Sequence, residues 1–257
     1  MGISFRPNGM TSAAHALRYW ERRQEVVSNN LANVSTDGFK AERAFASLMD
    51  GALPEIDTAT DLRAGTLRPT GAPLDLAMGG DGFLVVQSPD GERLSRGGAL
   101  RLDDQHRLVT AQGYPVLGER GPVVLDAADA EQVDAALTAA GTDGGPLGAL
   151  VQVSREGTVR VGDRTVGTLR VERVAPGTRL QHAGDALFLP PAATERTPVP
   201  PAERDVRQGV LEESNVDSVS ALVEMITVQR AYASVQKAMT TLDSARGMVT
   251  NEIGKPV

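Results

Sequence analysis

From Ser218 to Val249 the chain reads SVSALVEMITVQRAYASVQKAMTTLDSARGMV. Small or apolar side chains recur there in alternating steps of three and four residues, which is the spacing of a coiled-coil seam. The seam consists of Ala221, Val228, Ala231, Val235, Ala238, Leu242, Ala245 and Val249, interrupted by Glu224. A second stripe beside it consists of Leu222, Met225, Tyr232 and Met239. Because residues 213–218 are rich in N-cap side chains, the pattern predicts a long helix that begins near Ser218.

The amino-terminal region carries the same pattern. Its seam consists of Met10, Ala13, Leu17, Trp20, Val27 and Leu31, with Gln24 in the remaining place. This predicts a helix over residues 9–34, which the turn-forming residues 33–38 end. Two helices packed on their own domain would explain the pattern. The alanines favour helices that are stabilised by packing against partner chains. A face of small residues buries little area against one neighbour, and isolated helices are marginally stable in water.

The middle of the chain is predicted to be rich in β-strands. Short apolar runs alternate with turn sequences, as in Phe83–Gln87 followed by Ser88–Gly91, which indicates an antiparallel sandwich or barrel-like domain. An acidic insertion at about 126–143, with a short alanine-rich helix at its centre, is expected to be a solvated excursion. The proline-rich residues 190–207 are expected to lack regular structure and to form a return linker.

The predicted fold class is therefore α+β, with an antiparallel β-rich central domain and long terminal helices that pair as a coiled coil. Four segments follow from these patterns. They are an N-terminal helix and motif (1–45), an extended linker (46–75), the β-rich domain (76–210) and a C-terminal helix (211–257).

Composition excludes several classes of function. The formal net charge is −7, whereas a nucleic-acid partner requires a basic surface. The chain has no cysteine, which excludes disulfides and thiolate chemistry. No window approaches the roughly 20 apolar residues of a membrane span, and the first residues lack the apolar stretch of a signal peptide. We expect no nucleic acid, no membrane insertion and no cleaved leader.

Motifs for catalysis or ligand binding are also missing from the sequence. The histidines (His15, His106 and His182) do not form a ligand-spaced pair. No Gly-x-Ser-x-Gly elbow accompanies the serines. The glycines of residues 79–82 precede a strand, whereas a phosphate loop precedes a helix. We therefore expect no catalytic residue, no metal and no cofactor, and the chain is predicted not to be an enzyme.

Four segments resemble the flagellar basal-body rod and hook proteins. They are Ser28–Lys40 (SNNLANVSTDGFK), Gly65–Ala77 with Gly80–Phe83, Gly113–Gly118 (GYPVLG), and Gly209–Val216 (GVLEESNV) with Met225–Ile226 and Gln229–Tyr232. They lie in the family's order and extend over the whole chain. Only 25 positions separate Lys40 from Gly65, a short interval that favours the proximal rod type within the family. The distal rod type, in which the Gln229–Tyr232 motif is also common, is the alternative.

The resemblance implies a structural subunit of the basal-body rod, which spans the periplasm. Such a subunit polymerises helically with copies of itself and with other rod proteins, and it transmits torque from motor to hook. The terminal helices would form the inner core and the β domain would lie outside it. The flagellar type III export apparatus would secrete the chain unfolded, without a cleaved signal peptide. A secreted β-domain adhesin and a cell-wall hydrolase are the alternatives from other classes.

Under this interpretation the functional site is an interface between subunits. We expect Asn29, Asn30 and Asn33 to satisfy backbone groups where the helix ends and neighbours meet, with plain C-capping as the alternative. The predicted interface residues are Met10, Ala13, Leu17, Trp20, Gln24, Val27, Asn29, Asn30, Leu31, Asn33, Leu222, Met225, Val228, Ala231, Val235, Ala238 and Leu242.

Overall fold

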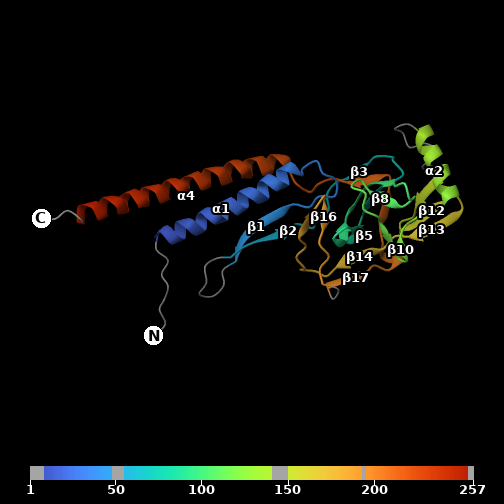
Figure 1. Cartoon of the computed structure of the whole chain (residues 1–257), viewed down its shortest axis with the longest axis horizontal. Helices are drawn as coiled ribbons and strands as arrows, with labels where there is room; N and C mark the ends of the chain where they lie inside the picture. Colours follow the sequence, from blue (N-terminus) through green and yellow to red (C-terminus); the bar gives the residue numbers. More distant parts are fainter. Residues whose placement is uncertain (1–8, 48–54, 141–149, 193–194, 254–257) are drawn as a thin grey trace. The chain divides into compact units, whose positions relative to one another are not determined.

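A computed structural model of the chain describes residues 9–47, 55–140, 150–192 and 195–253 (Figure 1). The chain forms two compact units. The helical unit comprises Met1–Ala32, Glu42–Ala59 and Val216–Val257, and the β unit comprises Asn33–Ala41 and Thr60–Asn215. The prediction of an α+β fold with a β-rich central region, an N-terminal helix and a C-terminal helix is confirmed.

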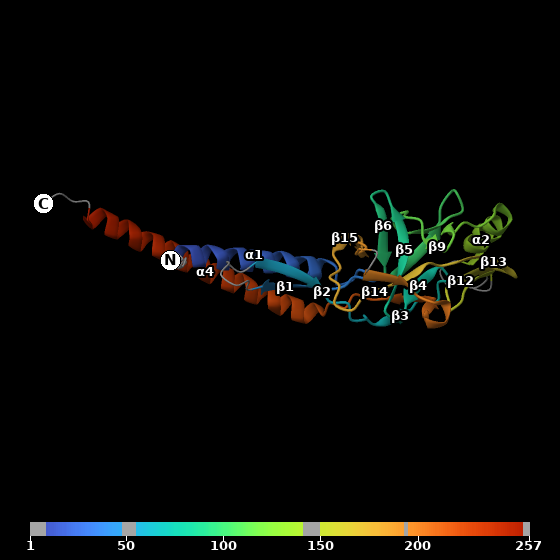
Figure 2. The same ribbon diagram turned by 90° about the horizontal axis from the view of Figure 1, so that it is seen from below.

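Two long helices dominate the helical unit. Helix α1 (Gly9–Ala32) and helix α4 (Ser218–Ile253) lie side by side and run in opposite directions (Figures 1 and 2). The Asp217 carboxylate caps α4 by accepting a hydrogen bond from the Ser220 N–H over 2.7 Å. Hydrogen bonds from Ser220 lower the pKa of Asp217. Strands β1 (Glu42–Ser47) and β2 (Glu55–Thr60) form a two-stranded sheet, and β1 packs on α1.

The β unit is built from antiparallel sheets, as predicted. The largest contains β15 (His182–Gly184), β16 (Leu187–Phe188), β6 (Gly91–Ser95), β5 (Gly82–Ser88), β14 (Val171–Val174) and β17 (Arg196–Pro198), in that order. The second contains β18 (Val206–Gln208), β4 (Asp75–Met78), β7 (Gly97–Leu102) and β8 (Leu108–Thr110). Smaller sheets pair β11 (Val151–Val153) with β12 (Thr158–Val161) and β13 (Arg164–Thr168), β9 (Leu117–Gly118) with β10 (Gly121–Pro122), and β3 (Leu67–Pro69) with β19 (Val210–Glu212).

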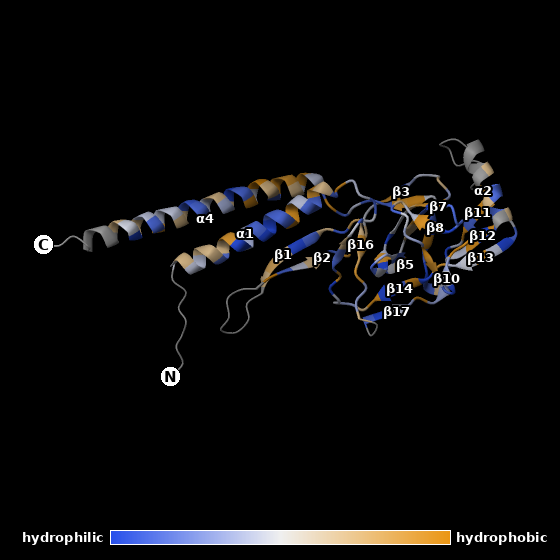
Figure 3. Ribbon diagram, viewed as in Figure 1, coloured by the Kyte–Doolittle hydropathy of each residue, from blue (hydrophilic) through white to orange (hydrophobic). Residues whose placement is uncertain are grey.

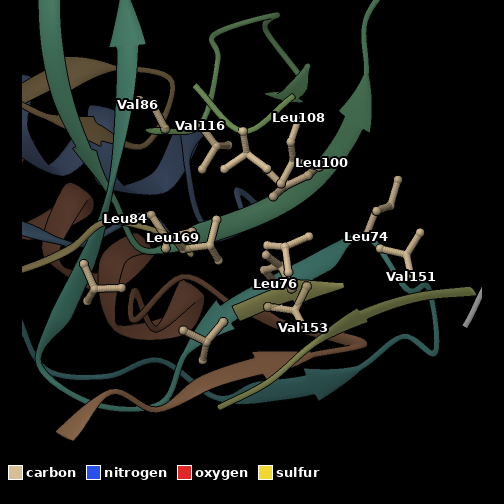
Figure 4. Close-up of a cluster of buried hydrophobic side chains, with 14 of the residues drawn as sticks. Leu74, Leu76, Leu84, Val86, Leu100, Leu108, Val116, Val151, Val153 and Leu169 are labelled. Atoms are coloured by element: carbon tan, nitrogen blue, oxygen red, sulfur yellow. The ribbon is translucent and has the colours of Figure 1, made fainter. Parts of the chain in front are cut away.

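Leucine and valine fill the core of the β unit (Figure 4). Strand β5 shows how the core is divided, because its side chains alternate between two buried clusters. Leu84 and Val86 belong to the larger cluster, where Leu84 lies beside Leu169 and Val86 lies beside Val116. Phe83 and Val85 belong to a second cluster with Leu94, Leu117, Val174, Leu180 and Phe188. Strand β5 is therefore buried on both faces, as expected for an inner strand of the six-stranded sheet.

The acidic insertion contradicts the prediction of a solvated excursion. Helix α2 (Ala127–Ala140) forms at its centre, as expected, but Ala130 and Val133 are fully buried and Asp129 is only 4% exposed. Ala130 and Val133 join the main core together with Leu125. The prediction was wrong because α2 has a narrow apolar face, formed by Ala130 and Val133 three residues apart, among its acidic residues. Residues 141–143 of the insertion lie outside the described residues.

The proline-rich residues 190–207 are not devoid of regular structure, so that prediction was also wrong. They contain β17, a 3-10 turn at Pro201–Glu203 and the first residues of β18. Pro198 is tolerated because β17 is an edge strand of its sheet, where a missing N–H leaves no ladder bond unmade. The segment expected to be an extended linker, residues 46–75, contributes β2 and β3 to paired sheets.

Ion pairs cross the six-stranded sheet and give the β unit a testable pH dependence. Arg170 Nη1 donates to Glu92 Oε1 over 2.7 Å, and Arg196 Nη1 donates to Glu92 Oε2 over 3.1 Å. The hydrogen bond from Arg170 lowers the pKa of Glu92 below its ordinary value of 4.5. Because the folded-state pKa is the lower one, the interaction stabilises the fold above that ordinary value and is lost as the pH falls through the lowered pKa.

We expect Glu92→Gln to destabilise the β unit at neutral pH by about 1 kcal/mol, since the carboxylate is only 29% exposed and bonds two arginines. The difference from the parent chain should shrink as the pH falls from about 4.5 through the lowered pKa of Glu92, because the protonated Glu92 is uncharged like the glutamine. Urea unfolding at a series of pH values measures it. Glu131→Gln, at an exposed position of α2, is the control. A difference that stays constant from pH 7 to pH 3 would contradict the prediction.

Candidate functional site

The two long helices of the helical unit meet along a partly apolar seam. Val228 is 0% exposed and Val27 is 2% exposed, so the centre of the seam is closed within the chain. Beside it, the Arg23 guanidinium donates two hydrogen bonds to Glu224 Oε1, over 2.7 and 3.0 Å. This contact explains how Glu224 can interrupt the apolar series, because its carboxylate is paired with a residue of the opposite helix.

The predicted interface residues occupy three environments. Buried within the chain are Val27, Asn30 and Val228. Half-buried are Met10, Ala13, Leu17, Trp20, Gln24, Leu31, Asn33, Met225, Ala231 and Val235. Exposed are Asn29, Leu222, Ala238 and Leu242. The contact between α1 and α4 therefore uses the middle of the predicted seam inside one chain, and contacts of the other residues with further subunits stay a prediction.

Asn30 holds the start of β1 against the end of α1. Its Nδ2 donates to the Glu42 carbonyl over 2.8 Å, and its Oδ1 accepts from the Glu42 N–H over 2.9 Å. The buried Asn30 side chain thus makes the same pair of hydrogen bonds to Glu42 that a residue of a neighbouring β-strand would make. Asn33 belongs to the β unit, where its Oδ1 accepts a hydrogen bond from Thr36 Oγ1 over 3.1 Å.

The first turns of α4 carry a second apolar face that only Leu222 represents in the predicted set. The α4 outer stripe consists of Val219 (67% exposed), Leu222 (49%), Val223 (59%) and Ile226 (51%). Val219 and Val228 are nine residues apart, so at about 100° per residue they point in opposite directions. The spacing i, i+3, i+4, i+7 of the stripe was the signal that could have identified it.

A buried ion cluster occupies the β unit where its first and last segments meet. Lys40, Arg96 and Glu212 have side chains that are 0%, 4% and 1% exposed. Lys40 Nζ lies 2.5 Å from Glu212 Oε1, and Arg96 Nε donates to Glu212 Oε2 over 2.9 Å. Burial lowers the pKa of Lys40, and the hydrogen bond to Glu212 opposes that shift. Two cations that are removed from water therefore share one carboxylate as their counter-ion.

Backbone groups supply further hydrogen bonds to the cluster. Lys40 Nζ donates to the Arg63 carbonyl over 2.7 Å, and the Gly65 N–H donates to Glu212 Oε1 over 2.9 Å. The Arg96 guanidinium donates to the carbonyls of Met78, Gly80 and Gly82 over 2.7 to 2.9 Å. A side chain at position 65 would clash with the Glu213 carbonyl, which explains the glycine there. The cluster thus joins four separate segments of the chain.

Asn215 adds a second connection between the same segments. Its Oδ1 accepts a hydrogen bond from the Ala41 N–H over 2.7 Å. Its Nδ2 donates to the carbonyls of Asp61 and Arg63 over 2.8 and 2.9 Å. The chain passes between the two units after residues 32, 41, 59 and 215. Asn215 therefore ties together, within the β unit, residues that adjoin three of these four crossings.

The resemblance segments supply four members of this network, whereas Arg96 lies outside them. Lys40 ends the first segment, Gly65 begins the second, and Glu212 and Asn215 belong to the last. These residues are far apart in the sequence, and Lys40 and Glu212 are separated by 172 positions. Their convergence gives a physical reason for the residue types, since the cluster needs an ammonium group, a carboxylate and a glycine at fixed places.

The described residues offer no candidate catalytic or metal centre. Within the described ranges, no group of three or more His, Cys, Asp or Glu side chains is placed to hold a metal ion. His182 stacks on Phe39 at a centroid distance of 4.9 Å and contacts Phe188 at 4.8 Å, so it acts as an aromatic packing residue. Of the helices in the described parts, none is long and apolar enough to cross a bilayer.

Three family models match the chain in the order in which its segments occur. Residues 10–40 match "Flagella basal body rod protein", and residues 77–161 match "Flagellar hook protein FlgE/F/G D1 domain". Residues 207–252 match "Flagellar basal body rod FlgEFG protein C-terminal". The first and last matches include Lys40 and Glu212, and the last also includes the α4 outer stripe.

Whole-length relatives agree with these models. The chain is 33% identical over 247 residues to the flagellar basal-body rod protein FlgF of Escherichia coli, covering 88% of this chain and 90% of the relative. It is 36% identical to FlgF of Salmonella typhimurium, with the same coverage. To the flagellar basal-body rod protein FlgG of Caulobacter vibrioides it is 30% identical over 265 residues, covering 91% and 95%. The chain belongs to the family of flagellar basal-body rod proteins, which are structural proteins and not enzymes.

Proposed function

We propose that this protein is a rod subunit of the proximal type that polymerises through its helical unit. In this proposal α1 and α4 form a coiled coil in the inner core of the rod, and the β unit forms the outer part. The polymer transmits torque from the motor to the hook, and the chain reaches the periplasm-spanning rod through the type III export apparatus. Three FlgF relatives support the proximal type, because they are 32–36% identical to the chain and three FlgG relatives are 30% identical, while two further FlgF relatives are 27% and 28% identical.

The observation that carries the proposal is the α4 outer stripe. Figure 3 shows the first turns of α4 as strongly hydrophobic. Val228 faces α1, whereas Val219 and Val223 point away from it and are more than half exposed. A helix that is apolar on opposite faces is expected to be buried on both of them. Since α1 covers one face, the other requires a neighbouring chain.

The charge distribution also favours assembly through the helical unit. Its segments hold nine basic and ten acidic residues, which leaves a formal charge of −1. The β unit holds 17 basic and 23 acidic residues, a formal charge of −6. Copies can therefore approach through their helical units with little net repulsion, while the charge of the β unit opposes unspecific association.

We expect the variant Leu222→Ser/Ile226→Ser to fold and to lose self-association. Both side chains are about half exposed, so the isolated chain should lose little stability, whereas the polymer should lose its apolar contact. Sedimentation velocity over a concentration series, with circular dichroism as the test of folding, measures the two effects. The matched control is Thr240→Ser/Thr241→Ser, which alters exposed polar positions of the same helix more than three turns beyond the stripe. Self-association equal to that of the parent chain would refute the proposed role of the stripe.

A further inference from the structure

We propose that the α4 outer stripe of one copy packs on the outward face of α1 in a second copy, with Arg230 opposite Glu21. This inference rests on the proposed self-assembly and names the two surfaces that meet. It follows from the exposed residues of both helices, from their charges and from the register in which α1 and α4 pair within one chain.

The stripe and the residues that continue it define what a partner must provide. Arg230 lies seven residues after Val223, which is two helical turns, and therefore on the same face. It is exposed, and no described residue forms an ion pair with its guanidinium. A partner must accordingly accommodate bulky aliphatic side chains over two turns and then present a negative charge.

The outward face of α1 meets both requirements. Asn29 and Ala32 are exposed and short or small, and the exposed Ser28 lies at the edge of this face, where it contacts Met225 of its own chain. A neighbouring helix can therefore approach closely and place its larger side chains over Asn29 and Ala32. One to three turns towards the N-terminus, Glu25 and Glu21 are exposed. Glu25 pairs with Arg22 over 2.9 Å, whereas no ion pair of the described residues uses Glu21. Glu21 is therefore the acidic group available to a second chain.

The register within the chain indicates how the two surfaces match. Arg23 lies opposite Glu224, and Ser28 lies opposite Met225. If α1 of the second copy meets α4 in the same antiparallel register, the stripe covers the Ser28–Ala32 end of α1. Arg230 lies six residues beyond Glu224 and five beyond Met225, so the two contacts place it level with positions 17 and 23 of α1 respectively. Glu21 lies between these two positions.

The geometry of this contact fits a polymer. The donor surface is on α4 and the acceptor surface is on α1, so the interface is heterologous and each copy keeps one surface of each kind available after pairing. A contact between different surfaces propagates into a ring or a helical row, whereas a self-complementary contact stops at a dimer. A stripe that paired with itself would give only dimers.

Charge exchange between the two positions tests the pairing with the full chain. Arg230→Glu and Glu21→Arg each place like charges opposite each other and should weaken self-association about tenfold or more. The double variant should return to within a few-fold of the parent chain. An equimolar mixture of the two single variants should also associate like the parent chain, because each supplies the charge that its neighbour lacks. Asp243→Arg, an exposed position away from the stripe, is the control.

Sedimentation velocity gives the association constants, and circular dichroism establishes that each variant is folded. A parent chain that stays monomeric at all concentrations would overturn both the self-assembly and the pairing. Self-association of the parent chain that neither single variant weakens, or that the double variant and the mixture fail to restore, would overturn the Arg230–Glu21 pairing and leave the self-assembly intact.

Discussion

Glu212→Gln is expected to destabilise the β unit by about 3–5 kcal/mol, because it leaves two buried cations without their counter-ion. Lys40 and Arg96 are at most 4% exposed and share this carboxylate. The amide can accept a hydrogen bond from one of them, but it cannot neutralise either charge. The loss is a large fraction of the roughly 5–15 kcal/mol that stabilises a typical protein. Urea unfolding monitored by amide exchange of the buried strand β5 measures it.

Companion variants show whether the loss comes from the uncompensated charge. Lys40→Met removes one cation and leaves Glu212 paired with Arg96, so we expect a smaller loss, of about 1–2 kcal/mol. The double variant Lys40→Met/Glu212→Gln should lose less stability than the sum of the losses of the two single variants, because Lys40→Met removes one of the two uncompensated charges. Additive losses, or a loss below about 1 kcal/mol for Glu212→Gln, would show that the cluster does not act as a unit.

The predictable part of the fold is the part that sequence periodicity encodes. A helix repeats every 3.6 residues, so the apolar series around Val27 and Val228 predicted both long helices from local sequence alone. Turn residues between short apolar runs predicted antiparallel strands in the same way. Helix α2 was also predicted, yet its burial was not. Two apolar side chains, Ala130 and Val133, pack on the core. The surrounding acidic residues make the segment polar on average, so its composition does not indicate burial.

The buried ion cluster could not be derived in this way, because its members meet only after the chain has folded. Nothing in the sequence near Lys40 indicates a carboxylate 172 positions away. The resemblance segments marked Lys40, Gly65 and Glu212 as residues of a shared pattern, without saying that they touch. Only the three-dimensional arrangement supplies the physical reason, which is the need to pair every charge that is removed from water.

The α4 outer stripe was only partly predicted from the sequence, because α4 has two apolar faces in its first turns. A coiled-coil seam is one apolar face, and the face containing Val228 has that spacing. The first turns of α4 are apolar on both sides, so the seam spacing places Leu222 beside the seam and does not include Val219 and Val223. In a subunit that assembles, the two faces have different partners. A pattern with two apolar faces therefore predicts a buried helix even where the isolated chain leaves one face exposed.

Val228→Asp is expected to separate α1 from α4 and to abolish assembly while the β unit stays folded. Val228 is 0% exposed in the seam, and Arg23, a cation of the facing helix, already pairs with Glu224. Burying a carboxylate there unpaired would cost several kcal/mol. The helices gain little from their alanine-lined contact, so separating them is the less costly response.

Trp20 makes the outcome measurable, because it is the only tryptophan of the chain and lies on α1. Its fluorescence should shift to longer wavelength in Val228→Asp, and the helical signal in circular dichroism should fall. Protected amides of β5 should remain protected, because Val228 does not belong to the β unit. Thr227→Asp places the same charge one residue earlier at an exposed position, and it should change neither signal. If Val228→Asp kept the parent fluorescence, the seam could not be what holds the two helices together, and the assembly proposed for the helical unit would lose its structural basis.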